Sequence, residues 1–166
     1  MASLEEQLSA LGVEGVQPVG GMLSGAKAED FENNPVLEQM WAMQAFKYAE
    51  THFTLIQSRD AKEFQLTRVD DELYEAVRER FKELKVDVID VESIKSPAGK
   101  EVWRQFCNDF REKVHDFNFA TLLRIDSSKE YDEANTVIVP RAQFLAIEVV
   151  RNRQGLNSMH SKKTTS

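Results

Sequence analysis

The residues best suited to chemistry in this 166-residue chain are polar and charged side chains gathered near its C-terminus. Arginine forms paired hydrogen bonds with carboxylates and phosphates, and Glu148 has the spacing to pair with Arg151 or Asn152 on a helix. Two interpretations stay open, a solvated face laced with ion pairs or a polar recognition surface for a partner. The residues concerned are Arg141, Gln143, Glu148, Arg151, Asn152, Arg153 and Asn157.

Patterns typical of catalysis or of a bound cofactor are weak elsewhere in the chain. The glycine-rich stretch 20–27 lacks the order of glycine, lysine and hydroxyl that a phosphate loop needs. The histidines stand outside any zinc-binding pattern, and the acidic residues at 70–72, 87 and 90 do not follow the spacing of a calcium loop. Cys107 follows an apolar stripe and is expected in the core. We therefore expect no catalytic residue, no cofactor, no metal and no enzymatic activity.

Composition and charge exclude several classes of function. The chain has 21 Lys and Arg against 28 Asp and Glu, a net charge of −7, which argues against a nucleic-acid binder. Its single cysteine excludes an internal disulfide. The sequence shows neither a signal peptide nor a run of roughly 18 apolar residues, the length of a membrane span. A reducing compartment, the cytosol or the nucleus, is expected. The prediction is a cytoplasmic monomer that contacts neither membrane nor nucleic acid.

Aromatic residues define the expected domain. All 15 lie between Phe31 and Phe144, whereas residues 1–30 hold five of the seven glycines. Segment 1–30 is therefore expected to be flexible, with Leu4, Leu8 and Leu11 forming either a frayed end or a short amphipathic turn that docks on a partner. The polar residues 158–166 are expected to form a flexible tail. A single helical domain is predicted over 31–157.

Helical spacing predicts four long helices that position these residues. The first, over 35–57, is apolar almost all round, which is typical of a buried central helix. After a short turn at 60–64, the second begins at Asp70 or Asp71. The third begins at Pro97 and carries an apolar stripe as far as Phe117. The fourth begins at Pro140 and stops at Gly155.

Two short runs, 85–90 and 121–126, alternate apolar and polar residues as strands do. They form either a paired ribbon or two extended connectors, because runs this short are ambiguous. The predicted fold class is therefore mainly α, a compact bundle of about four long helices with room for one small two-stranded ribbon.

Several motifs in register resemble one eukaryotic family, the polysaccharide biosynthesis domain-containing proteins. The resemblance covers about residues 33–157. It is carried by NP and WAM within 34–43, LTRVDD at 66–71, WRQFC at 103–107, DFNF at 116–119, TLLRID at 121–126, and PRAQF, AIE and RNRQG within 140–155.

The resemblance implies a small helical protein of the cytosol that acts as a dedicated chaperone for translation elongation factor 1-alpha. In the family this role concerns the nascent GTPase domain, is sensitive to GTP, and takes place beside the nascent polypeptide-associated complex on the ribosome. Carried over by matching positions, the partner surface would use Arg124, Asp126, Arg141, Gln143, Glu148, Arg151, Asn152 and Arg153. The matching aromatic residues Trp41, Trp103, Phe106, Phe117 and Phe144 are assigned to the core.

Two other functions compete with the chaperone. A generic adaptor would use the same polar helix for a different partner. An enzyme of polysaccharide metabolism, as the family name suggests, would need a pocket with paired carboxylates or a metal.

Overall fold

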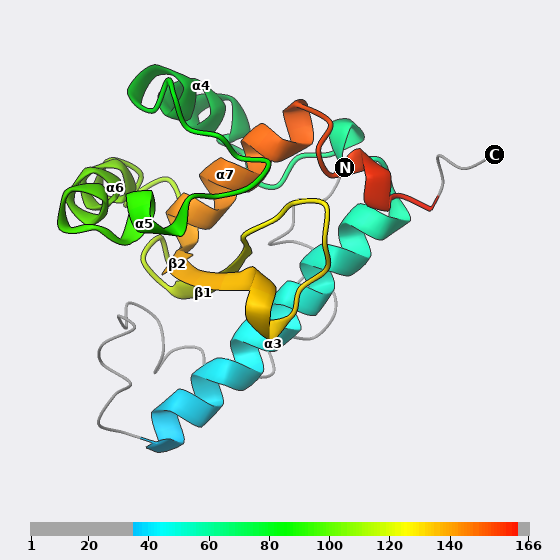
Figure 1. Ribbon diagram of the computed structural model, residues 1–166, viewed down its shortest axis with the longest axis horizontal. Coiled ribbons are helices and arrows are strands. Elements are labelled where there is room, and N and C mark those ends of the chain that lie inside the picture. The colour runs from blue at the N-terminus through cyan, green and yellow to red at the C-terminus, as the bar shows by residue number, and fades with distance from the viewer. Residues whose placement is uncertain (1–34, 163–166) are drawn as a thin grey trace.

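A computed structural model describes residues 35–162 and shows a mainly helical fold with one small ribbon (Figure 1). The leucines at 4, 8 and 11 and the glycine-rich stretch 20–27 lie outside these residues. The α-helices are α3 (Pro35–Ser58), α4 (Asp70–Arg80), α5 (Val91–Lys95), α6 (Pro97–Asp109) and α7 (Arg141–Arg153). The strands are β1 (Ala120–Arg124) and β2 (Thr136–Pro140), and three 3-10 turns are η3 (Ala61–Glu63), η4 (Glu133–Asn135) and η5 (Ser158–His160).

Helix α7 occupies the centre of the fold. Every residue from Arg141 to Asn152 is buried, and the helix contacts α4, α6, η3 and both strands. Figure 1 shows α7 running between α3 on one side and α4 and α6 on the other. The expectation that the first long helix is the central one is therefore wrong. Helix α3 instead leaves Met43 and Phe46 63% and 62% exposed.

The helix boundaries follow local capping chemistry. Ser96 accepts a hydrogen bond from the Gly99 N–H and is followed by Pro97 at the first helical position of α6. Helix α4 begins at Asp70, as predicted. Gly155, with φ of 79°, lies just beyond the end of α7 in the left-handed conformation that ends many helices.

Helix α6 ends earlier than its apolar stripe predicts. It stops at Asp109, and the backbone then continues in turns until Asp116, whose φ of 51° redirects the chain into β1. Phe110 and Val114 are nevertheless buried in the same core as Phe106. A succession of turns keeps the i, i+4 spacing of apolar side chains, so this spacing looked helical in the sequence.

The ribbon pairs β1 with a strand that the sequence pattern did not predict. β1 and β2 are antiparallel, with Ala120 opposite Pro140 and Arg124 opposite Thr136. Segment 85–90 contributes a single bridge, Val88 to Asp126, and the Ile89 N–H donates to the Ile125 carbonyl at 2.9 Å. Segment 85–90 therefore pairs with 121–126 only just beyond the end of β1, whereas β2 pairs with β1 along its whole length.

The folded unit extends past residue 157. η5 covers Ser158–His160, Ser161 is 3% exposed, and the Ser158 hydroxyl donates to Asp60 at 2.6 Å. The expectation of a flexible tail from residue 158 is therefore wrong for residues 158–162. These contacts arise because the chain returns to α3, where the Lys162 N–H donates to the Gln57 carbonyl at 2.9 Å.

Candidate functional site

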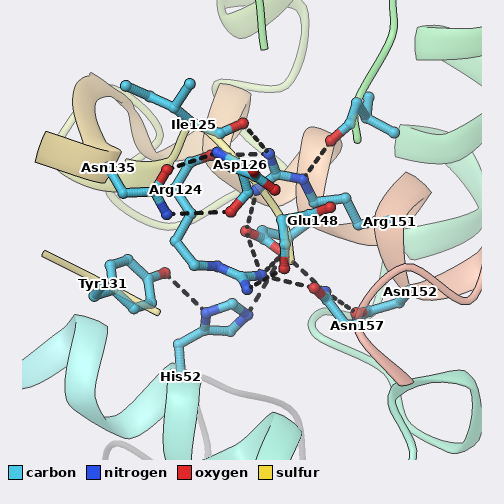
Figure 2. A network of polar contacts seen from close by, with 12 residues as sticks. His52, Arg124, Ile125, Asp126, Tyr131, Asn135, Glu148, Arg151, Asn152 and Asn157 are labelled. Carbon is cyan, nitrogen blue, oxygen red and sulfur yellow. Dashed lines mark hydrogen bonds and ion pairs between the residues drawn. The ribbon is translucent and has the colours of Figure 1, made fainter. Parts of the chain in front are cut away.

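A buried charged cluster centred on Glu148 joins most of the residues that the sequence singled out (Figure 2). Glu148 points from the middle of α7 into the interior, and its carboxylate accepts hydrogen bonds from Arg124, Arg151 and Asn157. All four side chains are fully buried or nearly so. Such a carboxylate is tolerated in an apolar interior only because charged and polar donors surround it.

Arg124, at the end of β1, connects the ribbon to α7 and to the C-terminal segment. Its Nη2 donates to Glu148 Oε1 at 3.2 Å and to Asn157 Oδ1 at 2.7 Å. Its Nη1 donates to the carbonyl of Ser127 at 2.8 Å. The guanidinium therefore holds the start of the loop that follows β1 against the core.

Arg151 lies one turn after Glu148 on α7 and donates hydrogen bonds to Glu148 and to three backbone carbonyls. Its Nη1 donates to Glu148 Oε2 at 2.9 Å, and its Nε donates to the Val86 carbonyl at 2.7 Å. Its Nη2 donates to the carbonyls of Arg124 and Ile125 at 2.8 and 3.2 Å. These bonds satisfy backbone groups at the edge of the ribbon, which explains how α7, segment 86–89 and β1 are held together.

The electrostatics of the cluster favour an ionised glutamate and a neutral histidine. Burial alone would raise the pKa of Glu148, but the charges of Arg124 and Arg151 outweigh burial and hold that pKa well below its usual range. His52, from α3, has Nε2 3.8 Å from Glu148 Oε1. Burial lowers the pKa of His52 to about 4, so its imidazole is neutral near pH 7.

Several polar atoms of the cluster have no hydrogen-bond partner among the described residues. They are Nε of Arg124, Nε2 of His52 and Nδ2 of Asn152. The orientation of Asn152 follows from Asn157, whose Nδ2 donates to Asn152 Oδ1 at 2.7 Å. Two guanidinium groups share one carboxylate, so the cluster carries an excess of one positive charge. Closed to solvent, it acts by positioning backbone segments.

The burial of most predicted partner-binding residues contradicts the expectation that they form an exposed surface. These residues are buried because α7 and the end of β1 lie at the centre of the fold. Arg141 stacks on Tyr48, with the guanidinium carbon 4.9 Å from the ring centre. The buried residues are Arg124, Arg141, Gln143, Glu148, Arg151 and Asn152, none more than 8% exposed.

Asp126 and Arg153 are the two predicted contact residues that reach solvent. Asp126 accepts hydrogen bonds from the N–H and hydroxyl of Ser128, at 2.9 and 2.7 Å, in the loop after β1. Arg153 pairs with Asp71 on α4, and its guanidinium lies 5.0 Å from the centre of the Tyr74 ring. A recognition role by direct contact is therefore open to these two residues.

Other candidate reactive groups are also placed in the interior. Burial raises the pKa of the Cys107 thiol to about 12. Within residues 35–162, no group of three or more His, Cys, Asp and Glu side chains is arranged to hold a metal ion. None of the helices in this part of the chain is both long enough and apolar enough to cross a membrane.

Comparison with known proteins gives a consistent match over nearly the whole described region. The family model described as PBDC1 protein matches residues 37–162. Protein PBDC1 of Homo sapiens is 46% identical over 147 residues, which cover 85% of this chain and 63% of the human protein. The chain thus spans less than two thirds of the length of that relative.

More compact relatives match over almost their full length. The Protein PBDC1 homolog of Schizosaccharomyces pombe is 40% identical over 139 residues, which cover 81% of this chain and 95% of the relative. A solution NMR structure of a protein from Saccharomyces cerevisiae is 40% identical, with a TM-score of 0.71. That alignment covers 82% of this chain and 97% of the yeast one.

Proposed function

Because the chain belongs to the PBDC1 protein family, as its motifs predicted, we propose that it is a non-catalytic, client-specific chaperone. Its client is the nascent GTPase domain of translation elongation factor 1-alpha, which it binds and helps to fold in the cytoplasm. It acts as a monomer, beside the nascent polypeptide-associated complex on the ribosome. The observation that carries this proposal is the family match over residues 37–162, since the resemblance implies this role.

The chemistry of the interior supports binding over catalysis. A nucleophilic cysteine needs a low pKa and access to solvent, whereas burial raises the pKa of Cys107 to about 12. A catalytic base works best with a pKa near the operating pH, whereas burial lowers the pKa of His52 to about 4. Both groups are therefore suited to packing.

The client surface is proposed at the exposed edge of the buried cluster. Asp126 and Arg153 make the direct contacts, while Arg124, Glu148 and Arg151 hold the loop after β1 and the end of α7 in position. Arg141, Gln143 and Asn152 make no direct contact with this client, because they are buried. A rigid scaffold beneath a few exposed charged residues favours specific recognition over promiscuous binding.

A binding titration tests this proposal. The full chain is titrated against the isolated GTPase domain of elongation factor 1-alpha with GTP, with GDP and without nucleotide. We expect binding that depends on nucleotide and that weakens at least fivefold in Asp126→Lys and in Arg153→Glu. Arg78→Glu, on the exposed side of α4, is the control and should bind like the unmodified chain.

The outcomes of this titration test the chaperone function and the proposed contact residues separately. Equal binding by all variants would retain the chaperone and reject the proposed contact residues. No binding in any nucleotide state would reject the chaperone in favour of an adaptor for another partner.

A further inference from the structure

A surface groove lies between the ribbon and the helices α5 and α6. The groove is basic, although the chain as a whole is acidic. Its volume is about 480 Å³, within the range of sites that bind small molecules or single peptide side chains. Lys95, Lys100 and Arg104 line it, and no acidic residue does. A cluster of cations without acids is unusual in a chain whose net charge is −7.

Among residues 35–162, the two lysines of this groove have no carboxylate partner. Lys95 donates to the Ile138 carbonyl of β2, which is a neutral acceptor, and Lys100 forms no ion pair within residues 35–162. Arg104 differs because it already pairs with Glu101. Burial, followed by the charge of Lys100, lowers the pKa of Lys95. A negative charge placed between the two ammonium groups would relieve both effects.

The floor of the groove is apolar and already fixed in position. Trp103 is 4% exposed and stacks on Phe81, with ring centres 4.1 Å apart and an angle of 10° between the rings. Ile138 and Pro140 of β2 complete this floor. Because Trp103 is almost covered, most of the apolar surface open to a ligand comes from the half-buried Ile138 and Pro140. Side chains held by packing lose little conformational freedom on binding.

The groove also offers hydrogen bonds suited to a peptide backbone. Gln143 lines it with a side chain that is 3% exposed, and its carboxamide makes no hydrogen bond to another residue within 35–162. A carboxamide can donate to a carbonyl and accept from an N–H, which is the pair that one peptide unit presents. The strand β2 pairs on one side only, with β1.

We propose that this groove binds an acidic peptide segment of a partner protein. Carboxylates of the segment pair with Lys95 and Lys100, and the backbone bonds to Gln143. An apolar side chain rests on Ile138 and Pro140 above the edge of Trp103. The groove accepts a short segment and one apolar side chain, so binding is transient, with a Kd on the order of 10–100 µM. This inference is independent of the identity of the client proposed above.

The number of cations in the groove favours a peptide over a nucleic acid as the ligand. A nucleic acid is recognised mainly through many phosphate contacts made by a broad basic surface. The groove has two lysines without a carboxylate partner in the described part of the chain, and the 28 acidic side chains of the chain outnumber its 21 basic ones. Two carboxylates next to an apolar side chain match this arrangement better than a phosphate backbone.

Fluorescence anisotropy with a labelled synthetic peptide tests the proposal on the full chain. The probe is a ten-residue peptide with four Glu or Asp around one Phe. Two matched peptides replace the acids with Gln and Asn, or the Phe with Ala. We expect saturable binding of the acidic peptide that weakens at least tenfold for the neutral peptide and about fivefold without the Phe. Raising NaCl from 50 to 300 mM should also weaken it.

Variants of the protein locate the binding site. The double substitution Lys95→Glu with Lys100→Glu should weaken binding at least tenfold. Arg78→Glu with Lys82→Glu changes the net charge equally at exposed positions outside the groove, and should bind as before. Circular dichroism and thermal melting show whether each variant keeps its fold. A groove variant that melts early is replaced by Lys100→Gln alone, which should weaken binding about threefold.

Three results would overturn the proposal. The first is equal affinity for the acidic and neutral peptides, or for the groove variant and its control. The second is tighter binding of a ten-nucleotide single-stranded RNA. The third is a tenfold gain in peptide affinity in Phe31→Ala, which would assign the groove to the acidic residues 29–32 of the chain itself.

Discussion

Arg124 on the ribbon and Glu148 on the central helix meet in the interior, with Nη2 3.2 Å from Oε1 and neither side chain exposed. Arg151 binds the other carboxylate oxygen and two carbonyls at the end of the ribbon. One carboxylate thus fixes the distance between β1 and α7. The loop after β1, which carries Asp126, is positioned by the same contacts.

Glu148→Gln should destabilise the protein severely. Within residues 35–162, Glu148 is the only negative charge in contact with the two buried guanidinium groups. Leaving a buried charge uncompensated costs about 3–5 kcal/mol. The free energy of unfolding measured by urea titration should fall by that amount.

The exposed ion pair between Arg153 and Asp71 is the matched control. Arg153→Gln removes an arginine from the same helix, but the Asp71 side chain is 81% exposed. Pairs of this kind contribute about 0–1 kcal/mol. If both variants lost the same stability, the buried cluster would have no special role.

Stability should fall as pH decreases because His52 is held neutral. Burial lowers its folded pKa to about 4, from an ordinary value of 6.5 that the unfolded chain retains. Between these values the unfolded state binds more protons, so acid favours unfolding. From pH 7.5 to pH 4.5 this one group should remove about 2–3 kcal/mol of the unfolding free energy.

The difference between the unmodified chain and His52→Gln isolates this contribution. Glu148 has a depressed pKa and acts in the same direction, with its stabilisation lost only at lower pH. It titrates in both proteins, so its effect cancels in the difference. Parallel stability curves for the two proteins across pH 4.5–7.5 would show that His52 does not titrate as described.

The sequence predicted the elements far better than their packing. Asn34-Pro35 and Ser96-Pro97 placed the starts of α3 and α6, and Gly155 marked the end of α7, because capping depends on a few neighbouring residues. The predicted end of α6 was wrong and β2 was not predicted, because both depend on contacts between distant segments. Spacing alone does not distinguish a helix from successive turns that bury the same face.

The functional residues were harder to predict, for a physical reason. Glu148, Arg151 and Asn152 were recognised as a group, but the sequence did not reveal whether solvent or Arg124 would satisfy their charges. In the run 144–150 every residue except Glu148 is apolar, and this was the signal that α7 is buried. The groove was missed because it forms only when α5 and α6 lie beside the ribbon, which brings their lysines next to Ile138 and Pro140.

Cys107 should be almost unreactive toward thiol reagents in the folded protein. Burial raises its pKa from 9.0 to about 12, which reduces the thiolate fraction at pH 8 about 1,000-fold. Alkylation by iodoacetamide, followed by mass spectrometry, should be slow in buffer and rapid in 6 M urea. Equal rates in both conditions would show that the thiol is accessible.

Gly99→Ala should destabilise the protein although alanine is the better helix former. Replacing glycine inside a helix normally stabilises it by about 0.5–1 kcal/mol. Here a Cβ atom would lie 1.9 Å from the Ser93 carbonyl oxygen, so backbone atoms of α5 would have to move. We expect a net loss of about 1–3 kcal/mol, the usual cost of overpacking, in a urea titration.

The same substitution should weaken the peptide binding proposed for the groove, because Lys95 and Lys100 lie on the two helices that Gly99 holds together. Gly155→Ala is the comparison. There the Cβ would meet the mobile end of the Lys62 side chain at 2.8 Å, in a backbone with φ of 79°. It should cost about 1 kcal/mol and leave peptide affinity unchanged. A Gly99→Ala protein that kept full stability and affinity would refute the close packing of α5 on α6.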